Sequence, residues 1–221
     1  MFTDRIDAGR RLAETLTGRL GAGGPEQALP ADALVLGVPR GGVIVAVEVA
    51  RALGRDLDIE VVRKIGAPGN PEYAIAAVDA DGELIAGEGL AADTEYLHRE
   101  AVSAGAEIRR RLAVYRADRP APVIAGRTVV LVDDGVATGL TLIAAVRSLR
   151  RRGAVRIIVA APVASPSAEQ ALHREADEMV VLWVDPHLRA VGQYYTRFGQ
   201  VTDAEVTAAL HASWHEREQA R

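Results

Sequence analysis

Short, continuous apolar runs alternate along this chain with segments of helical spacing. The run ALVLGV at 33–38 lacks the polar alternation of a half-exposed strand, which is typical of a strand covered on both faces. Strands that alternate with helices favour right-handed crossovers and parallel pairing. The sequence therefore predicts an α/β fold with a mostly parallel central sheet flanked by helices. Further strands are predicted at 57–62, 128–133, 155–161 and 178–183, and helices at 41–53, 139–151 and 166–175.

The whole chain, residues 1–221, is predicted to form a single domain with its core at about 30–200. An amphipathic helix is predicted at 4–20, because apolar residues recur there at roughly helical spacing. The tail is helical and polar in pattern, so we expect a peripheral C-terminal helix at 203–217.

The middle of the chain has a different character. KIGAPGNPE, residues 64–72, holds two prolines and two glycines, which predicts irregular structure. Strands at 73–78 and 83–86 are predicted to form a hairpin, and 93–116 is predicted to be a long, charged helix.

Composition excludes several classes of function. The chain of 221 residues has no cysteine, so disulfides, thiolate metal sites and a catalytic thiol are ruled out. Its formal net charge of -4 gives no general electrostatic reason to bind nucleic acid or an anionic membrane. No segment approaches the ~20 apolar residues of a membrane span, and the charged N-terminus does not resemble a signal peptide. We therefore expect a cytoplasmic protein that binds neither nucleic acid nor membrane.

Two runs of three arginines, 109–111 and 150–152, raise the question of RNA binding. The second run ends a predicted helix, where positive charge favours the dipole, and the first lies among compensating acids. Because the chain is acidic overall, we interpret both runs as solvated faces. The histidines lack the spacing of metal-binding motifs.

The stretch VVLVDDGVATGLT, residues 129–141, places two adjacent acids and a small turn at the end of a predicted strand. In open α/β sheets, ligands bind beyond the carboxyl ends of the strands. The helix that begins near Gly139 directs free backbone N–H groups to this place, which suits a phosphate. Asp133 and Asp134 repel phosphate, but they can accept hydrogen bonds from vicinal hydroxyls or hold magnesium through water. Together these groups predict a pocket for a ribose 5-phosphate.

Two other interpretations of this stretch are weaker. A P-loop requires GxxxxGK[ST], which is absent, and no lysine lies near the turn. A residue that only caps the helix would explain one aspartate, but not two followed by TGxT.

VVLVDDGVATGLT resembles the phosphoribosyl-pyrophosphate (PRPP) binding motif of type I phosphoribosyltransferases, in which an apolar strand runs into two acids and TGxT. PRPP synthetases and some transcriptional regulators share this motif. The resemblance implies the type I fold with a hood subdomain, and it makes Asp133 and Asp134 the ligands of the ribose hydroxyls. It also implies that the following turn binds the 5-phosphate through Gly135, Val136, Ala137, Thr138, Gly139 and Thr141.

The resemblance assigns a pyrophosphate-binding loop to VPRGG, which follows the strand at 33–38. In this family the loop often has an unusual backbone conformation, which Gly41 and Gly42 would tolerate. Pro39 belongs to the same loop, and Arg40 could make charge-assisted bonds to diphosphate oxygens. An arginine beside a flexible turn is more often merely solvated, so the assignment depends on the first motif.

A second diphosphate contact is implied at RKIGAPGNPEY, which begins at Arg63. Type I enzymes carry a mobile loop after this strand that closes over the active site and excludes water. Lys64 is the only lysine in the chain, and a compact ammonium suits such a loop. An ordinary loop stiffened by prolines is the open alternative. Arg63 and Lys64 are thus candidate diphosphate ligands, and Lys64 with Arg40 would stabilise the leaving group.

The fragment VDPHLRAVGQYYTRFGQ, from Val184, carries several aromatic residues in an aromatic-poor chain. Core packing is one explanation. In the family, however, a variable hood near a terminus recognises the acceptor, so Tyr194 and Tyr195 are candidate acceptor-binding residues that could stack on a planar ring. Ala137 stands where hypoxanthine-guanine transferases carry an acid that contacts the purine. The acceptor therefore stays open.

The resemblance implies an enzyme that transfers 5-phosphoribosyl from PRPP to a nucleobase or another nitrogen nucleophile, with Mg²⁺ bridging diphosphate oxygens. Its partners would be small-molecule substrates, and a homodimer is left open. Asp133 and Asp134 would position the ribose and contact the metal through water. The alternative is a non-catalytic PRPP- or nucleotide-binding regulator, and a phosphate-ester hydrolase also stays open. VPRGG and Lys64 favour the transferase, because a ribose-phosphate sensor needs fewer diphosphate ligands.

Overall fold

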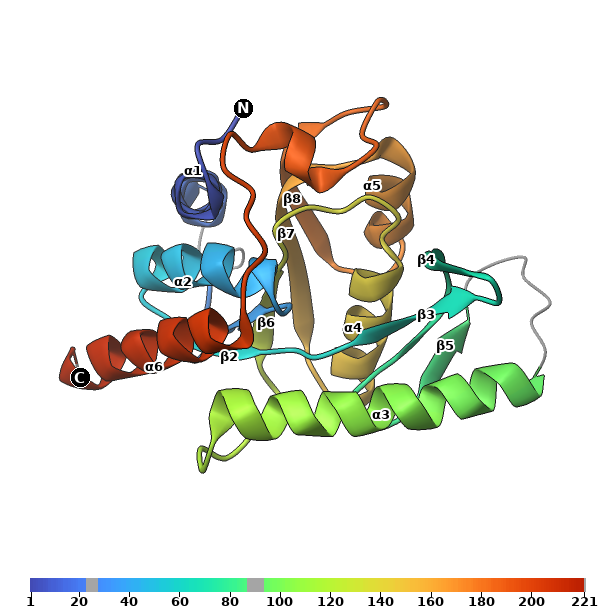
Figure 1. The fold of residues 1–221 in the computed structure, drawn as a ribbon. Helices are drawn as coiled ribbons and strands as arrows, with labels where there is room; N and C mark the ends of the chain where they lie inside the picture. Colours follow the sequence, from blue (N-terminus) through green and yellow to red (C-terminus); the bar gives the residue numbers. More distant parts are fainter. Residues whose placement is uncertain (23–27, 87–93, 221) are drawn as a thin grey trace.

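The computed structural model describes residues 1–22, 28–86 and 94–220, and a sheet of five strands lies at its centre (Figure 1). Each strand pairs in parallel with its neighbours. This arrangement confirms the predicted α/β class with a mostly parallel sheet. In spatial order the strands are β2 (Asp56–Ile59), β1 (Leu34–Gly37), β6 (Thr128–Val132), β7 (Arg156–Ala164) and β8 (Glu178–Val184).

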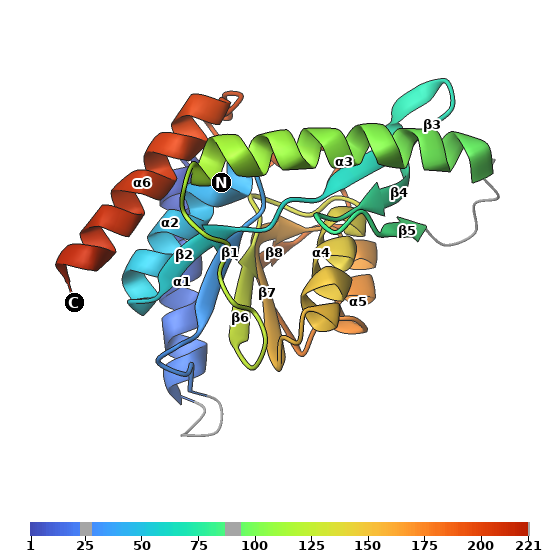
Figure 2. The same cartoon turned by 90° about the horizontal axis from the view of Figure 1, so that it is seen from below.

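Helices cover both faces of this sheet (Figure 2). On one side lie α1 (Arg5–Ala22), α2 (Gly41–Leu53) and α6 (Asp203–Gln219). On the other side lie α4 (Leu140–Arg151) and α5 (Pro166–His173). Within the described ranges, no helix combines the length and the apolar character that crossing a membrane requires.

The residues of β6 alternate between the two cores that these layers create. Val130 and Val132 belong to the core that α1 and α2 share, and Val129 and Leu131 to the core beneath α4. A strand buried on both faces has no solvent-facing position for a polar residue. This explains why the strands were visible in the sequence as unbroken apolar runs.

A second, antiparallel sheet of three strands lies beside the central one. It is formed in the order β3 (Arg63–Ala67), β4 (Asn70–Val78) and β5 (Leu84–Ala86). The long helix α3 (Thr94–Arg116) packs on β3 and β4 (Figure 1).

The prediction that residues 64–72 are irregular is wrong. β3 and β4 take up most of this segment, and Pro68 and Gly69 form only the short turn between them. Gly69 has a φ of 78°, a left-handed conformation that glycine adopts without steric cost. The register shifts on both sides of Gly66, which marks a β-bulge. The prolines and glycines therefore shape a hairpin and do not prevent one.

The run 150–152 is also not simply a solvated face. Arg151 forms an ion pair with the fully buried Asp79, which belongs to the turn after β4. The Arg152 Nη1 atom lies 2.8 Å from Oε2 of the buried Glu60. Burial raises the pKa of Glu60, and the Arg152 guanidinium counteracts that shift. The end of α4 is thus tied to the segment that leads into the second sheet.

The C-terminal helix α6 is less peripheral than its polar pattern indicated. Val206, Leu210 and Trp214 are buried in the core that contains α2. The Trp214 indole N–H donates a hydrogen bond of 2.7 Å to the Leu57 carbonyl in β2. Three apolar residues, spaced four apart, are enough to dock an otherwise polar helix.

We expect Trp214→Ala to lower the free energy of unfolding by about 3–5 kcal/mol, because it opens a cavity in the core. Trp214→Phe keeps most of the buried area but leaves the Leu57 carbonyl without its indole donor, so a loss of about 1–2 kcal/mol is expected. Urea unfolding followed by circular dichroism measures both. The control is Trp183→Phe, whose exposed ring should contribute within about 0.5 kcal/mol. A Trp214→Ala protein as stable as this control would make α6 peripheral after all.

Candidate active site

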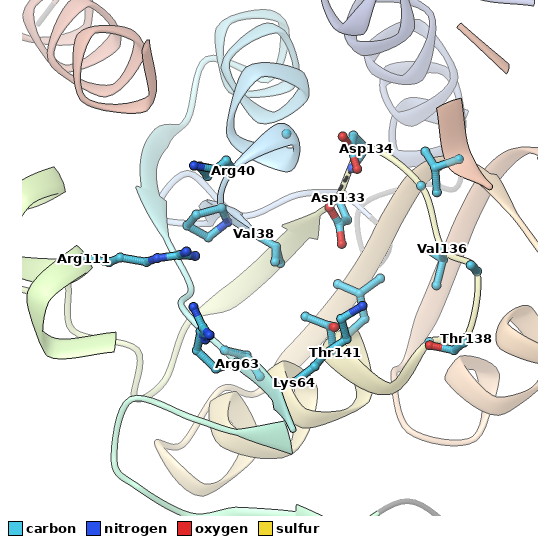
Figure 3. A pocket seen from close by; sticks show the side chains of 18 of the residues that line it. Val38, Arg40, Arg63, Lys64, Arg111, Asp133, Asp134, Val136, Thr138 and Thr141 are labelled. Atoms are coloured by element: carbon cyan, nitrogen blue, oxygen red, sulfur yellow. Dashed lines mark hydrogen bonds between the residues drawn. The ribbon is translucent and has the colours of Figure 1, made fainter. Parts of the chain in front are cut away.

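A cavity of about 700 Å³ opens at the carboxyl ends of β1 and β6, next to the start of β3 (Figure 3). Segments that are far apart in the sequence meet around it. The lining residues are Val38, Pro39, Arg40, Gly41, Val62, Arg63, Lys64, Arg111, Asp133, Asp134, Gly135, Val136, Ala137, Thr138, Gly139, Thr141, Leu142, Arg189 and Val191.

The turn between β6 and α4 forms one wall. Gly139 has a φ of 80°, so the chain enters α4 through a left-handed residue that favours glycine. The turn is anchored to the rim of the sheet, because the Val136 N–H donates to the Val163 carbonyl at 2.8 Å and its own carbonyl accepts from the Ser165 N–H at 2.9 Å. The first N–H groups of a helix have no partner within it, so the start of α4 presents donors to the cavity. Every residue predicted to bind the 5-phosphate lines this cavity: Gly135, Val136, Ala137, Thr138, Gly139 and Thr141.

The two predicted acids follow β6 directly, but their carboxylates have different surroundings. Asp133 Oδ1 accepts the Asp134 N–H at 2.8 Å, and in Figure 3 the Asp133 carboxylate is aimed toward the part of the cavity where Lys64 and Thr141 lie. Asp134 Oδ2 instead lies 2.7 Å from Nε of Arg5, the first residue of α1. Burial, followed by the negative charge of Asp134, raises the pKa of Asp133, while Lys64 opposes the shift. Burial also raises the pKa of Asp134, and Arg5 is its main opposing influence.

Four cationic side chains line the cavity on the side of the second sheet and α2 (Figure 3). Arg40 comes from the loop before α2, Arg63 and Lys64 from the start of β3, and Arg111 from α3. The first three were predicted as diphosphate ligands. A wall of guanidinium and ammonium groups is suited to an anionic ligand, because each can donate charge-assisted hydrogen bonds.

Arg111 was missed, because the run 109–111 was interpreted as a solvated face. Its side chain is only 17% exposed, and its Nε donates to Glu107 Oε1 at 2.8 Å. Hydrogen bonds from Arg110 and then Arg111 lower the pKa of Glu107 to about 2, so this carboxylate stays charged. The pair Glu107 and Arg111 has helical i, i+4 spacing, but nothing in that spacing indicates which face of α3 meets a cavity.

The VPRGG loop contains a cis peptide bond between Pro39 and Arg40, in agreement with the unusual backbone that the resemblance implied. Gly41 lines the cavity, whereas Gly42 is not among the lining residues. A Cβ on Gly42 would lie 2.8 Å from the Val132 carbonyl oxygen, so this glycine lets α2 start directly against the end of β6.

The two predicted acceptor-binding tyrosines do not line the cavity. Tyr195 is buried, its ring centroid lies 5.4 Å from that of Phe2, and its hydroxyl donates to the Asp134 carbonyl at 2.6 Å. The Tyr194 hydroxyl donates to a carboxylate oxygen of Asp185. Core packing, the simpler explanation, therefore describes Tyr195.

Arg189 and Val191, from the same C-terminal fragment, line the cavity in place of the tyrosines. A Cβ on Gly135 would lie 2.4 Å from Val191 Cγ1, so this glycine allows the fragment to cover the turn after β6. No sequence signal distinguished these two residues from their neighbours.

Comparison with known proteins identifies the family of this chain. The family model described as phosphoribosyl transferase domain matches residues 6–186. A Mycobacterium tuberculosis protein named as a phosphoribosyl transferase is 38% identical over 217 residues, which are 95% of this chain and 46% of that protein. An amidophosphoribosyltransferase of Mycobacterium leprae is 32% identical over 120 residues, which are 54% of this chain and 21% of that protein. The chain thus spans less than half the length of the curated relatives it matches.

Two solved structures match this chain over most of its length. The crystal structure of TT1426 from Thermus thermophilus has a TM-score of 0.77 and 47% identity, and the match covers 95% of this chain and 97% of that one. The AQ2163 protein from Aquifex aeolicus shares the fold, with a TM-score of 0.51 at 13% identity over 94% of this chain and 85% of that one. The domain match and the mycobacterial relative together show that the chain belongs to the type I phosphoribosyltransferase family.

Proposed function

We propose that this chain is a cytoplasmic enzyme that transfers 5-phosphoribosyl from PRPP to a nitrogen nucleophile and releases pyrophosphate. One observation carries the proposal: a single cavity combines a helix start, an acidic pair and a cationic wall. These match the three parts of PRPP, which are a phosphate, a vicinal diol and a diphosphate.

The 5-phosphate would bind at the turn before α4. Backbone N–H groups at a helix start and the partial positive charge of the helix dipole favour a dianion there. Thr138 and Thr141 would add hydroxyl donors, and Gly135 and Gly139 keep the backbone accessible. Val136 and Ala137 would contribute backbone groups of the same turn.

The ribose would lie over the acidic pair. Asp133 and Asp134 adjoin the phosphate turn in sequence, and a carboxylate is the natural acceptor for two neighbouring hydroxyls. The Asp133 carboxylate is the one aimed into the cavity (Figure 3). Its role would be to orient the ribose, so that the anomeric carbon faces the acceptor.

The diphosphate would bind the cationic wall. Arg40, Arg63, Lys64 and Arg111 would neutralise its charge, and the backbone of the loop 39–42 would approach it closely. Lys64 is exposed and lies in β3 close to the bulge at Gly66, so its ammonium has the freedom to follow a leaving group.

Magnesium would act with the substrate. Among the residues the structure describes, no cluster of three or more histidine or acidic side chains could hold a metal ion. Magnesium usually takes few protein ligands and keeps substrate oxygens and water, so the acidic pair fits an indirect contact. When bound, the ion would neutralise charge on the diphosphate oxygens.

In the proposed reaction the bond between the anomeric carbon and the diphosphate oxygen breaks, and pyrophosphate leaves with the electron pair. The acceptor nitrogen then forms the new bond to that carbon and loses its proton. The intervening positive charge on the ring favours catalysis by positioning, by stabilising the leaving anion and by excluding water.

Turnover with a panel of acceptors tests the proposal. The protein, Mg²⁺ and PRPP are incubated with nucleobases and with small amines, and pyrophosphate release is measured beside calorimetric binding of PRPP. Release that depends on one acceptor supports the transferase. Binding of PRPP without release by any acceptor indicates the non-catalytic regulator, and phosphate release indicates a hydrolase.

Asp133→Asn is expected to lower kcat/KM for PRPP by about tenfold to hundredfold, because a hydrogen bond to a charged group contributes roughly 1.5–3 kcal/mol. Initial rates of pyrophosphate release measure the effect. The matched control is Asp118→Asn, an exposed residue after α3 that removes the same charge outside the cavity. Equal activities of the two variants would remove Asp133 from the site.

Arg111→Gln is expected to raise the KM for PRPP about tenfold, since it removes one cation from the diphosphate wall. Arg110→Gln is the control: Arg110 lies on the same helix and pairs with the same Glu107, but it is not among the lining residues. If both variants change KM equally, the effect comes from loss of the Glu107 ion pairs, and Arg111 is not a ligand.

A further inference from the structure

A side chain of the N-terminal helix pairs with one of the two acids of the proposed active site. Arg5 is the first residue of α1, yet its Nε lies 2.7 Å from Asp134 Oδ2, and the two side chains are only 11% and 16% exposed. The Arg5 Nη1 donates to the Gly199 carbonyl at 2.8 Å, and the guanidinium carbon lies 3.9 Å from the centre of the Phe198 ring. Arg5 is therefore held from three directions while it neutralises one acid of the pair.

The start of α2 is shaped around this ion pair. A Cβ added to Gly41 would lie 1.8 Å from Asp134 Oδ2 and 2.6 Å from Arg5 Nε. No other residue type would fit at position 41 while the pair stays where it is. Gly41 of the VPRGG motif thus leaves room for the ion pair between Asp134 and Arg5. This is in addition to any contact that its backbone makes with a diphosphate.

The backbone of Asp134 is held by Tyr195, which in turn packs on Phe2 near the N-terminus. The Tyr195 hydroxyl donates to the Asp134 carbonyl at 2.6 Å, and the Tyr195 ring packs on Phe2. The Phe2 N–H donates to the Tyr194 carbonyl at 2.7 Å, and the Phe2 carbonyl accepts from the Thr196 N–H at 2.8 Å. These contacts place α1, and with it Arg5, at a fixed position relative to the acidic pair.

In this arrangement Asp133 and Asp134 have different roles. Asp134 donates its N–H to Asp133 Oδ1 and commits its own Oδ2 to Arg5. An unpaired second carboxylate at this place would repel an anionic substrate and compete for the ribose hydroxyls. Arg5 weakens both effects, because it opposes the charge of Asp134 and pairs with its Oδ2 oxygen.

We propose that Arg5 is a positioning residue for phosphoribosyl transfer: it holds and neutralises Asp134, so that Asp133 alone receives the ribose hydroxyls. The inference rests on the proposed function and assigns different roles to two acids that the family motif treats alike. Arg5 is outside that motif and is separated from Asp134 by 129 positions in the sequence.

Four variants and one control test this role through steady-state rates at varied PRPP. Arg5→Gln should raise the KM for PRPP about tenfold and change kcat less than about threefold, because it restores an unpaired charge beside an anionic substrate. Arg5→Lys should recover part of the loss, since an ammonium can pair with Asp134 but cannot reproduce the planar contact with Phe198. Asp134→Asn should relieve the effect of Arg5→Gln, so that the double variant Arg5→Gln/Asp134→Asn has a lower KM than Arg5→Gln alone, and Asp133→Asn should impair the protein more than Asp134→Asn does.

The control is Arg10→Gln, which removes another arginine of α1 that pairs with α2, through Glu48 at 3.1 Å, away from the cavity. It should leave KM unchanged. The double variant keeps the test decisive if Arg5→Gln alone does not fold, because it leaves no buried charge unpaired. A double variant as impaired as Asp133→Asn would overturn the proposal, as would Arg5→Gln with wild-type KM. A wild-type chain that neither binds nor consumes PRPP would overturn the proposed function itself.

Substitution of Gly41 tests the same arrangement without a substrate. Gly41→Ala should lower the urea midpoint of unfolding, because the new methyl group overlaps Asp134 and Arg5. Gly18→Ala, at an exposed position of α1 with nothing within 4 Å of the new Cβ, should leave the midpoint unchanged or raise it. If Gly41→Ala matches Gly18→Ala, the ion pair has room to move, and it does not fix Asp134.

Discussion

The parallel pairing of β1 with β6 is the constraint on which the site depends. Gly37 lies opposite Val132, so both strands end at the same level, and the Val38 N–H donates to the Val132 carbonyl at 2.9 Å. The same carbonyl limits the space at Gly42 to a hydrogen atom. Because α2 must begin this close to the end of β6, the VPRGG loop and the turn after Val132 open into one cavity. A small shift of this register would separate the cationic wall from the acids.

Buried ion pairs fix the second sheet and α3 against that frame. The Arg116 Nε, at the end of α3, lies 2.8 Å from Oδ1 of the buried Asp58 in β2. Arg151 and Arg152 play the same part for Asp79 and Glu60. Removing one partner from such a pair leaves an unpaired buried charge, which is strongly unfavourable, so these contacts hold the orientation of the elements they join. Arg63, Lys64 and Arg111 of the cavity wall are carried on those elements.

Features that depend on local pattern could be predicted from the sequence. Doubly buried strands leave apolar runs, and the phosphate turn is one continuous motif that begins at Asp133 and ends at Thr141. Arg111, which lines the cavity, and Arg5, which pairs with Asp134, could not be predicted, since each takes its place only because a helix crosses a distant part of the chain. Composition drew attention to Tyr195, but it cannot distinguish a ring packed on Phe2 from one that faces a ligand.

Lys64 is chemically distinct, because every other residue among the lysines and arginines of this chain is an arginine. It is the only lysine of the chain, and its side chain is exposed at the cavity wall. Reagents that acylate side-chain amines therefore have a single target in this chain, and that target lies where the diphosphate is proposed to bind. Covalent labelling would report ligand occupancy at one defined atom, with neither an engineered cysteine nor a background of other amines besides the chain terminus.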